Sequence, residues 1–234
     1  MLAENLHRTF RKQGYVIVRD FLTGNELDGL RDAGDQLLSE DPPEVGEGIH
    51  DIERGADRRF LRHRHLDFPQ MQAVLFSPKM RELTRTLLDG DSYLFNEQYV
   101  VKGPRTGASF AWHQDGAYVG FDHAPYLTLW MALDDTTVEN GCVYILPRDL
   151  DENAGLDPHE WDEDGKELVG YTGEDPGLPM TCPAGTLVAF SSTTLHRSGP
   201  NVTDRNRRGY LGQYTSEPLI DPATGAPKRF ATPL

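Results

Sequence analysis

The spacing of apolar residues divides the chain into a helical N-terminal part and a β-rich remainder. Up to about residue 90, apolar residues recur every three or four positions behind capping signals such as Thr23 to Glu26 and Ser77-Pro78. This pattern predicts helices over residues 3–13, 23–38 and 77–89. Short β-branched and aromatic runs bounded by Gly, Pro, Asn and Asp predict strands over residues 15–18, 92–102, 107–114, 126–133, 141–146, 186–190 and 208–215.

Many short strands without an internal repeat are typical of a jelly roll, and flanking helices would cover one of its sheets. We therefore expect a mainly β fold in one domain over residues 1–234. Within it, helices of residues 1–90 would pack on a β core of residues 91–217. Residues 39–55 are rich in Pro, Gly and acidic side chains without periodicity, which predicts an exposed loop.

Charge and composition narrow the classes of function. The 234 residues carry a net charge of −14, which argues against binding to nucleic acid or to an anionic membrane surface. Much of the excess negative charge lies in residues 147–177, where 11 acidic residues occur with 2 basic ones. Residues 1–8 lack the apolar core of a signal peptide, and no run of about 18 apolar residues occurs. The cysteines Cys142 and Cys182 lack zinc-ligand spacing, so we expect a cytoplasmic protein.

Three side chains are candidates for one metal ion. His113 and Asp115 are two residues apart, which on an extended strand points both side chains to one face. His196 closes the β-branched and apolar run of residues 185–195, which is typical of a buried strand. Two imidazoles and one carboxylate on adjacent strands form the facial triad of non-haem iron(II) oxygenases.

The His-x-Asp spacing alone is weak, because a surface ion pair would show the same pattern. A second pair, His65 and Asp67, has this spacing, but basic residues precede it and Phe68-Pro69 follows it. We interpret the second pair as a chance occurrence, since no buried strand is predicted to carry it.

Four segments support the metal hypothesis in a different way. They are residues 14–22 (GYVIVRDFL), 112–116 (WHQDG), 140–147 (NGCVYILP) and 196–207 (HRSGPN, ending at Arg207). Together and in this order they resemble the phytanoyl-CoA dioxygenase family of iron(II)- and 2-oxoglutarate-dependent oxygenases. The resemblance implies a double-stranded β-helix, or cupin-like jelly roll, in which His113, Asp115 and His196 hold iron(II). It also implies 2-oxoglutarate and O2 as cosubstrates, with release of succinate and CO2.

The far carboxylate of 2-oxoglutarate needs a cation, and a guanidinium offers it two hydrogen bonds in a fixed fork. The resemblance assigns this carboxylate to Arg207, at the start of a strand expected beside the one that ends at His196, and Ser198 would add a hydroxyl. Arg208 is the alternative, because the register of the arginine run is open from sequence alone.

Further positions follow from the resemblance. Gln98 and Lys102 match positions that face the cosubstrate or substrate in similar proteins. Trp130 would either wall the 2-oxoglutarate pocket or fill the core. The chain departs from the family's pattern after Pro147, where an acidic insertion begins.

The expected reaction is hydroxylation of a small molecule, because the carboxylate of Asp115 occupies the position that halogenating relatives leave to halide. Desaturation, cyclisation, epimerisation and demethylation remain alternatives. A cupin-like binding protein and a metal isomerase that needs no 2-oxoglutarate are rivals of another class, but neither has a use for Arg207. Either a monomer or a homodimer is compatible with the sequence.

A basic cluster stands out in this acidic chain. Its members are Arg54, Arg58, Arg59, Arg62, His63, Arg64 and His65. On a helix, Arg54, Arg58 and Arg62 would share one side, where like charges repel unless an anion offsets them. We expect that anion to be the acidic segment of residues 149–175, with an anionic substrate as the alternative.

Overall fold

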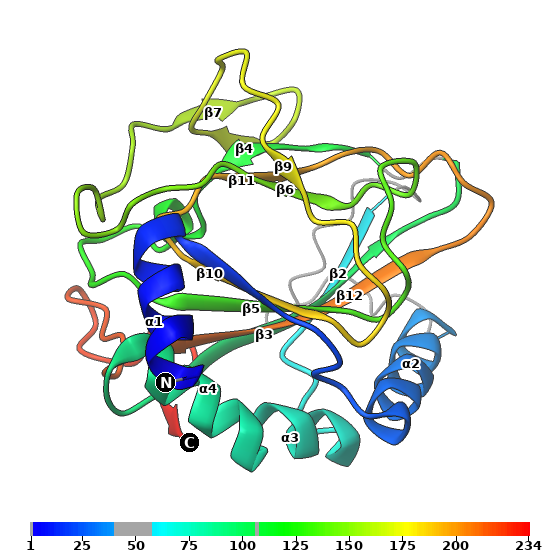
Figure 1. The fold of residues 1–234 in the computed structure, drawn as a ribbon, viewed down its shortest axis with the longest axis horizontal. Coiled ribbons are helices and arrows are strands. Elements are labelled where there is room, and N and C mark those ends of the chain that lie inside the picture. Colours follow the sequence, from blue (N-terminus) through cyan, green and yellow to red (C-terminus); the bar gives the residue numbers. More distant parts are fainter. Residues whose placement is uncertain (1, 40–57, 106–107) are drawn as a thin grey trace.

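Two antiparallel sheets lie face to face in the computed structural model, which describes residues 2–39, 58–105 and 108–234 (Figure 1). Within these residues the large sheet runs in the order β1-β10-β5-β12-β3-β13, with β2 also paired to β3. Its strands are β1 (Tyr15–Val18), β2 (Arg58–Arg62), β3 (Tyr93–Lys102), β5 (Leu127–Ala132), β10 (Leu187–Ser191), β12 (Arg207–Thr215) and β13 (Thr232–Pro233). The small sheet contains β4 (Phe110–His113), β11 (His196–Ser198), β6 (Val143–Ile145) and β9 (Leu178–Pro179). The jelly-roll prediction is confirmed.

The helices cover the outer face of the large sheet. They are α1 (Leu2–Gln13), α2 (Gly24–Ser39), α3 (Pro69–Leu75) and α4 (Pro78–Leu88). Strand β5 contributes side chains to two hydrophobic clusters, one on each face of the large sheet. Alternate side chains of a strand point to opposite faces. Leu127, Leu129 and Met131 join the cluster shared with the helices, whereas Trp130 lies in the cluster between the two sheets.

Local sequence signals account for the helix starts. The hydroxyl of Thr23 accepts from the backbone N–H of Glu26 at 3.4 Å, while the Glu26 carboxylate accepts from the Thr23 N–H at 2.7 Å. This is the predicted capping box. Ser77 caps α4 by accepting from the N–H of Met80 at 3.2 Å, with Pro78 at the first helical position. The predicted loop at residues 39–55 lies outside the described residues beyond Ser39.

Several expectations from the sequence are wrong, and two of them concern this part of the fold. The run of residues 185–195 is not one strand, because β10 ends at Ser191 and His196 begins β11 in the other sheet. The basic cluster is not a helix over its described part, since residues 58–62 form the strand β2 along β3. Arg54 lies outside the described residues. The helix α3 was not predicted from the sequence.

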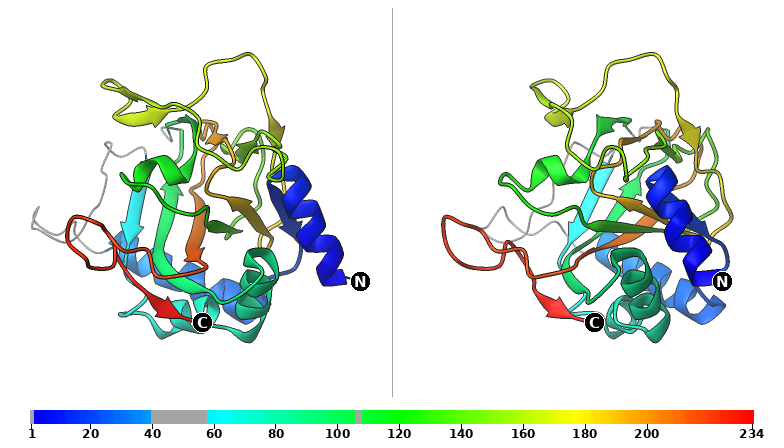
Figure 2. Two further views of the ribbon diagram at one scale, coloured as in Figure 1. Left: turned by 90° about the vertical axis from the view of Figure 1, so that its left-hand side faces the viewer. Right: turned by 60° about the vertical axis from the view of Figure 1, so that its left-hand side comes forward.

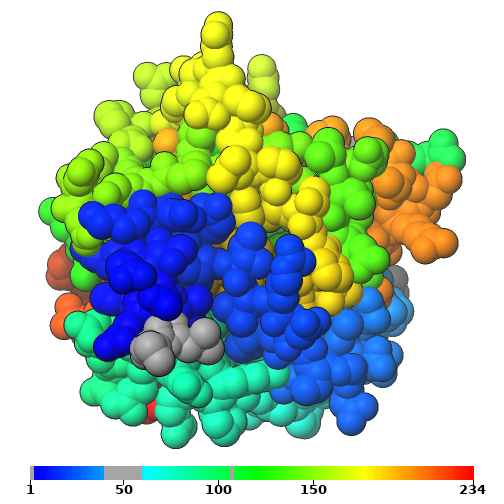
Figure 3. Space-filling model, in the orientation of Figure 1, coloured from blue at the N-terminus to red at the C-terminus, as the bar shows by residue number. Residues whose placement is uncertain are grey.

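The acidic insertion between β6 and β9 carries a hairpin of β7 (Glu160–Asp162) and β8 (Glu167–Val169). Its chain lies above the small sheet in Figure 1 and ends in the yellow projection at the top of Figure 3. Near its start, Asp149 accepts from Lys12 of α1 at 3.2 Å, and Asp151 pairs with Arg11 at 2.7 Å. The observed partners of the first acidic residues are therefore on α1. No helix of the described residues is long and apolar enough to cross a membrane.

Candidate active site

The three predicted ligands meet between the sheets. His113 is the last residue of β4 and lies opposite His196, the first residue of β11, in the small sheet. Asp115 follows two residues later, and its Oδ1 lies 3.7 Å from Nε2 of His113 and 3.6 Å from Nε2 of His196. The candidate ligand atoms all lie within 4.8 Å of one another. One ion can contact all three side chains.

Both imidazoles are oriented by the backbone. Nδ1 of His113 lies 2.8 Å from the carbonyl oxygen of Ala111, and Nδ1 of His196 lies 3.1 Å from that of Thr194. A carbonyl only accepts, so each Nδ1 carries the proton and each Nε2 offers its lone pair to the centre of the triad. The two histidines are 6% and 8% exposed, which limits competition from water. Metal-binding histidines are commonly fixed in this way.

Asp115 is not on a strand, contrary to the sequence-based expectation. It opens the short 3-10 helix η2 (Asp115–Tyr118), where the chain leaves the small sheet. Its Oδ2 accepts from the hydroxyl of Thr128 at 2.5 Å and from Nε2 of Gln213 at 3.0 Å. These two donors belong to β5 and β12 of the large sheet. They leave Oδ1 turned toward the two histidines.

Arg207 lies in the same cavity as the triad. Its guanidinium is buried, and Nη2 donates to the carbonyl of Gly141 at 2.7 Å. Nε is buried with no hydrogen-bond partner in the structure, and the charge lies 5.7 Å from the centre of the Trp130 ring. Burial lowers the pKa of Arg207 to about 10, so the group remains a cation at neutral pH. A buried cation with an unused donor suits an anionic ligand.

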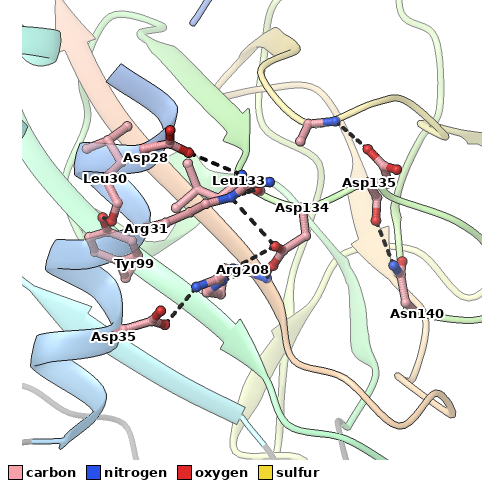
Figure 4. Close-up of polar contacts among 11 residues, drawn as sticks. Asp28, Leu30, Arg31, Asp35, Tyr99, Leu133, Asp134, Asp135, Asn140 and Arg208 are labelled. Carbon is pink, nitrogen blue, oxygen red and sulfur yellow. Dashed lines mark hydrogen bonds and ion pairs between the residues drawn. The ribbon is translucent and has the colours of Figure 1, made fainter. Parts of the chain in front are cut away.

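Arg208 points to the other face of β12, toward the helices. Its Nε and Nη2 donate to the Asp134 carboxylate at 3.0 and 2.8 Å, and Nη1 donates to Asp35 of α2 at 2.7 Å (Figure 4). These carboxylates raise the pKa of Arg208. Arg207 thus faces the cavity while Arg208 is already paired. The sequence placed β12 beside the strand before His196, but β5 lies between β10 and β12.

The comparisons with known proteins agree with this geometry. The family model of phytanoyl-CoA dioxygenase (PhyH) matches residues 10–209. The chain belongs to the phytanoyl-CoA dioxygenase family. A curated relative is a probable alpha-ketoglutarate-dependent hypophosphite dioxygenase of Stutzerimonas stutzeri, 27% identical over 230 residues that cover 92% of this chain and 79% of the relative. Alpha-ketoglutarate is another name for 2-oxoglutarate.

Two solved structures extend the family comparison. EvdO2 from Micromonospora carbonacea var. aurantiaca, complexed with 2-oxoglutarate, is 30% identical with a TM-score of 0.73, covering 96% of this chain and 94% of that one. The epimerase SnoN, in complex with Fe3+, alpha-ketoglutarate and nogalamycin RO, is 25% identical with a TM-score of 0.74, covering 100% and 95%. The similar proteins therefore include a probable dioxygenase and an epimerase.

The residues of this chain fit the cofactors of the phytanoyl-CoA dioxygenase family, iron and 2-oxoglutarate. Two neutral imidazoles and a carboxylate suit iron(II) and leave coordination positions open. The unpaired donor of Arg207 suits a carboxylate, and Ser198 of β11 lines the same cavity. The ligand atoms of the triad and the buried charge of Arg207 are therefore both suited to these cofactors.

The remaining predicted site residues divide into two groups. Trp130 and Gln98 line the cavity, and Gln98 accepts from Nε of Arg62 at 2.8 Å. Trp130 also packs between the sheets, so it both walls the pocket and fills the core. Lys102 is fully buried, lies outside the cavity lining and donates to the carbonyls of Ala108 and Gly199. The expected contact of Lys102 with the cosubstrate has no support in this arrangement.

His65 and Asp67, the second pair with the His-x-Asp spacing, each contact other residues, as expected for a chance occurrence of this spacing. Nδ1 of His65 lies 3.3 Å from the buried Glu97 carboxylate, while Asp67 accepts from Nε of Arg64 at 2.9 Å. Among the described residues, His113, Asp115 and His196 are the histidine, cysteine and acidic side chains that lie close enough together to hold one metal ion. His65 and Asp67 are not among them.

Sequence reasoning missed the groups behind Asp115. Thr128 is a polar residue within the wholly buried strand β5, and Gln213 is buried in β12. A buried polar side chain needs a hydrogen-bond partner. A polar residue inside an apolar strand can be recognised in the sequence once the strands are assigned.

We expect Thr128→Val to weaken iron(II) binding by roughly 10-fold, because it removes a donor that holds Asp115 in place. Iron titration under anaerobic conditions measures the change. Thr84→Val is the matched control, since Thr84 is equally buried but bonds Ser92 beside α4. Equal iron affinity in the wild type and in Thr128→Val would contradict the positioning role of Thr128.

Proposed function

We propose that this protein is an iron(II)- and 2-oxoglutarate-dependent hydroxylase of a small-molecule metabolite. The observation that carries the proposal is the single cavity that joins His113, Asp115 and His196 to a buried arginine with an unused donor. Iron(II) with 2-oxoglutarate and O2 supplies, when bound, an oxidant that removes hydrogen from a C–H bond, with release of succinate and CO2.

Each residue of the site has a distinct task in this proposal. His113, Asp115 and His196 hold the iron on one side and leave its other positions open. Arg207 receives the far carboxylate of 2-oxoglutarate through its free Nε–H, and Ser198 adds a hydroxyl. Trp130 keeps water from this ion pair, which strengthens it.

Hydroxylation is the favoured outcome because the Asp115 carboxylate occupies the third protein position of the triad. An epimerase is the second candidate, because SnoN carries that name and covers the whole length of this chain. The two outcomes share hydrogen abstraction, and substrate placement decides between them. Product mass separates them directly, since hydroxylation adds one oxygen and epimerisation leaves the mass unchanged.

The decisive experiment is turnover of the reconstituted protein. Iron(II) and 2-oxoglutarate are added without oxygen, then air and a library of small metabolites, and succinate and product masses are measured. Substrate-stimulated succinate with a product that gains one oxygen supports the proposal. A wild type that binds iron but forms no more succinate than His196→Ala would indicate a binding protein instead.

A further inference from the structure

The cavity is strongly basic in an otherwise acidic protein. It has a volume of about 240 Å³, and its lining includes the cations Arg62, Lys166, Arg197, Arg207, Lys228 and Arg229. Asp115 is the single acidic side chain among the described residues that line it. The net charge of the chain is −14, so this positive field is local. Charges of one sign in a cleft with low-dielectric walls concentrate ligands of the opposite sign.

Arg229 is held at the cavity by fixed backbone on both sides. Before it, the N–H of Lys228 donates to the carbonyl of Leu219 at 2.8 Å, and after it, the N–H of Phe230 donates to Phe95 at 3.1 Å. The Phe230 ring packs edge-on against His63 and His65, with ring centroids 4.9 and 4.8 Å apart. Figure 2 shows this C-terminal segment, in red, looping out and returning to the edge of the large sheet at β13. The backbone on both sides of Arg229 is therefore fixed, and its exposed side chain lines the cavity.

Arg229 and Lys166 have no carboxylate partner in the part of the chain that the structure describes, by hydrogen bond or ion pair. Other arginines do, such as Arg148 with Asp157 at 2.7 Å and Arg208 with Asp134. Lys166 enters the cavity lining from the turn between β7 and β8, where its φ is 45°. Two unpaired cations thus face one cavity from separate elements.

These cations lie outside the four segments that resemble the family's motifs. Lys228 and Arg229 follow residue 209, where the match to the family model ends. Lys166 belongs to the acidic insertion, which begins where the chain departs from the family's motif after Pro147. The cosubstrate already has Arg207, which lies in the same cavity.

We infer that the substrate carries an anionic oxygen group, a carboxylate or a phosphate, which Arg229 binds together with Lys166 and Lys228. This inference rests on the proposed function, because it names the substrate class of the same site. Phe60, Phe95, Phe110, Tyr118 and Tyr126 also line the cavity, so the rest of the substrate is apolar. The acidic group fixes the molecule while the carbon to be oxidised lies at the triad.

Binding of small probes to the iron-loaded protein tests the inference. Saturating 2-oxoglutarate is present without oxygen, so that Arg207 is occupied and no turnover occurs. Benzoate and phenyl phosphate are the anionic probes, and benzamide and benzyl alcohol are neutral molecules of similar shape. We expect an anionic probe to bind at least 10-fold more tightly than the neutral ones, and Arg229→Gln to abolish that preference. The better of benzoate and phenyl phosphate identifies the anionic group.

Arg85→Gln is the matched control, because Arg85 pairs with Asp91 beside α4 and does not line the cavity. It should retain the wild-type preference. Equal binding of anionic and neutral probes by the wild type overturns the inference, as does a lowered melting temperature of Arg229→Gln with unchanged probe affinity. Succinate formation by the wild type is measured in parallel. A protein that forms succinate but ignores the charge of the probe contradicts this inference alone, whereas one that forms none contradicts the proposed function.

Discussion

His196→Ala is expected to lower the affinity for iron(II) by more than about 100-fold, since even the groups that hold metal ligands in place contribute 10- to 100-fold. The ring supplies one of three donors, and its neighbours are the His113 ring, 4.2 Å away between centroids, and Asp115. Loss of the imidazole leaves two donors, which hold a divalent ion far less firmly. Equilibrium dialysis against iron(II) without oxygen measures the affinity directly.

The same substitution at His7 on α1 is the control, because this histidine lies on the outer helices. His7→Ala should bind iron as the wild type does. Alanine variants of His113 and Asp115 should match His196→Ala, and circular dichroism should show that each remains folded. Wild-type affinity in all three variants would end the metal-site hypothesis.

Arg207→Ala is expected to weaken 2-oxoglutarate binding by roughly 30-fold or more while iron remains bound. Truncating one member of a buried, hydrogen-bonded charge pair costs about 2–5 kcal/mol, and each 1.4 kcal/mol is tenfold in affinity. Arg207 is 1% exposed, so the charge pair that it would form is shielded from water. Titration of 2-oxoglutarate into the iron-loaded protein without oxygen gives the dissociation constant.

The neighbouring arginine supplies the control. Arg208→Ala removes the pairing with Asp134 and Asp35, which joins β12 to α2, and should lower the melting temperature without changing 2-oxoglutarate affinity. Arg207→Lys keeps the charge but loses the planar fork, so it should recover only part of the affinity. If Arg208→Ala alone weakened 2-oxoglutarate binding, the assignment of Arg207 would be wrong.

The break between β10 and β11 shows why hydrophobic pattern alone misplaces an element. The run of residues 185–195 has the β-branched and apolar content of a buried strand. In the structure, Oγ of Ser191 accepts from the N–H of Thr193 at 3.2 Å, and the N–H of Thr194 donates to the Ser191 carbonyl at 2.9 Å. Hydroxyl side chains thus build a turn that carries the chain to the second sheet. This choice depends on the partner strands, which the sequence does not show.

The triad was predictable as a set of residues but not as a geometry. The spacing of His113 and Asp115 indicated one face of a strand, yet the chain turns into η2 at Asp115. The carboxylate still meets the imidazoles because Thr128 and Gln213 reach it from the large sheet. Such contacts join residues far apart in sequence, so periodicity carries no sign of them.

Strand β2 shows that the spacing of charged residues does not distinguish a helix from a strand. Its arginines suggested a helix face from their spacing of four, but Phe60 and Leu61 are buried and pair along β3. Charged side chains are common on strands at the edge of a sheet, where they oppose association with other chains. The charge pattern alone was compatible with both structures, and burial against β3 decides between them.

With iron bound as proposed, the position of Asp115 would link the metal to the lifetime of the protein. The imidazoles belong to the small sheet, whereas the carboxylate is held by Thr128 and Gln213 of the large one. An ion bound by His113, Asp115 and His196 would therefore connect the two sheets. A ligand present at 100 times its dissociation constant stabilises the folded state by about 2.7 kcal/mol. Iron-starved molecules would open more often and be degraded sooner. The half-life of this protein in a cell would then follow the iron supply, whether or not its substrate is present.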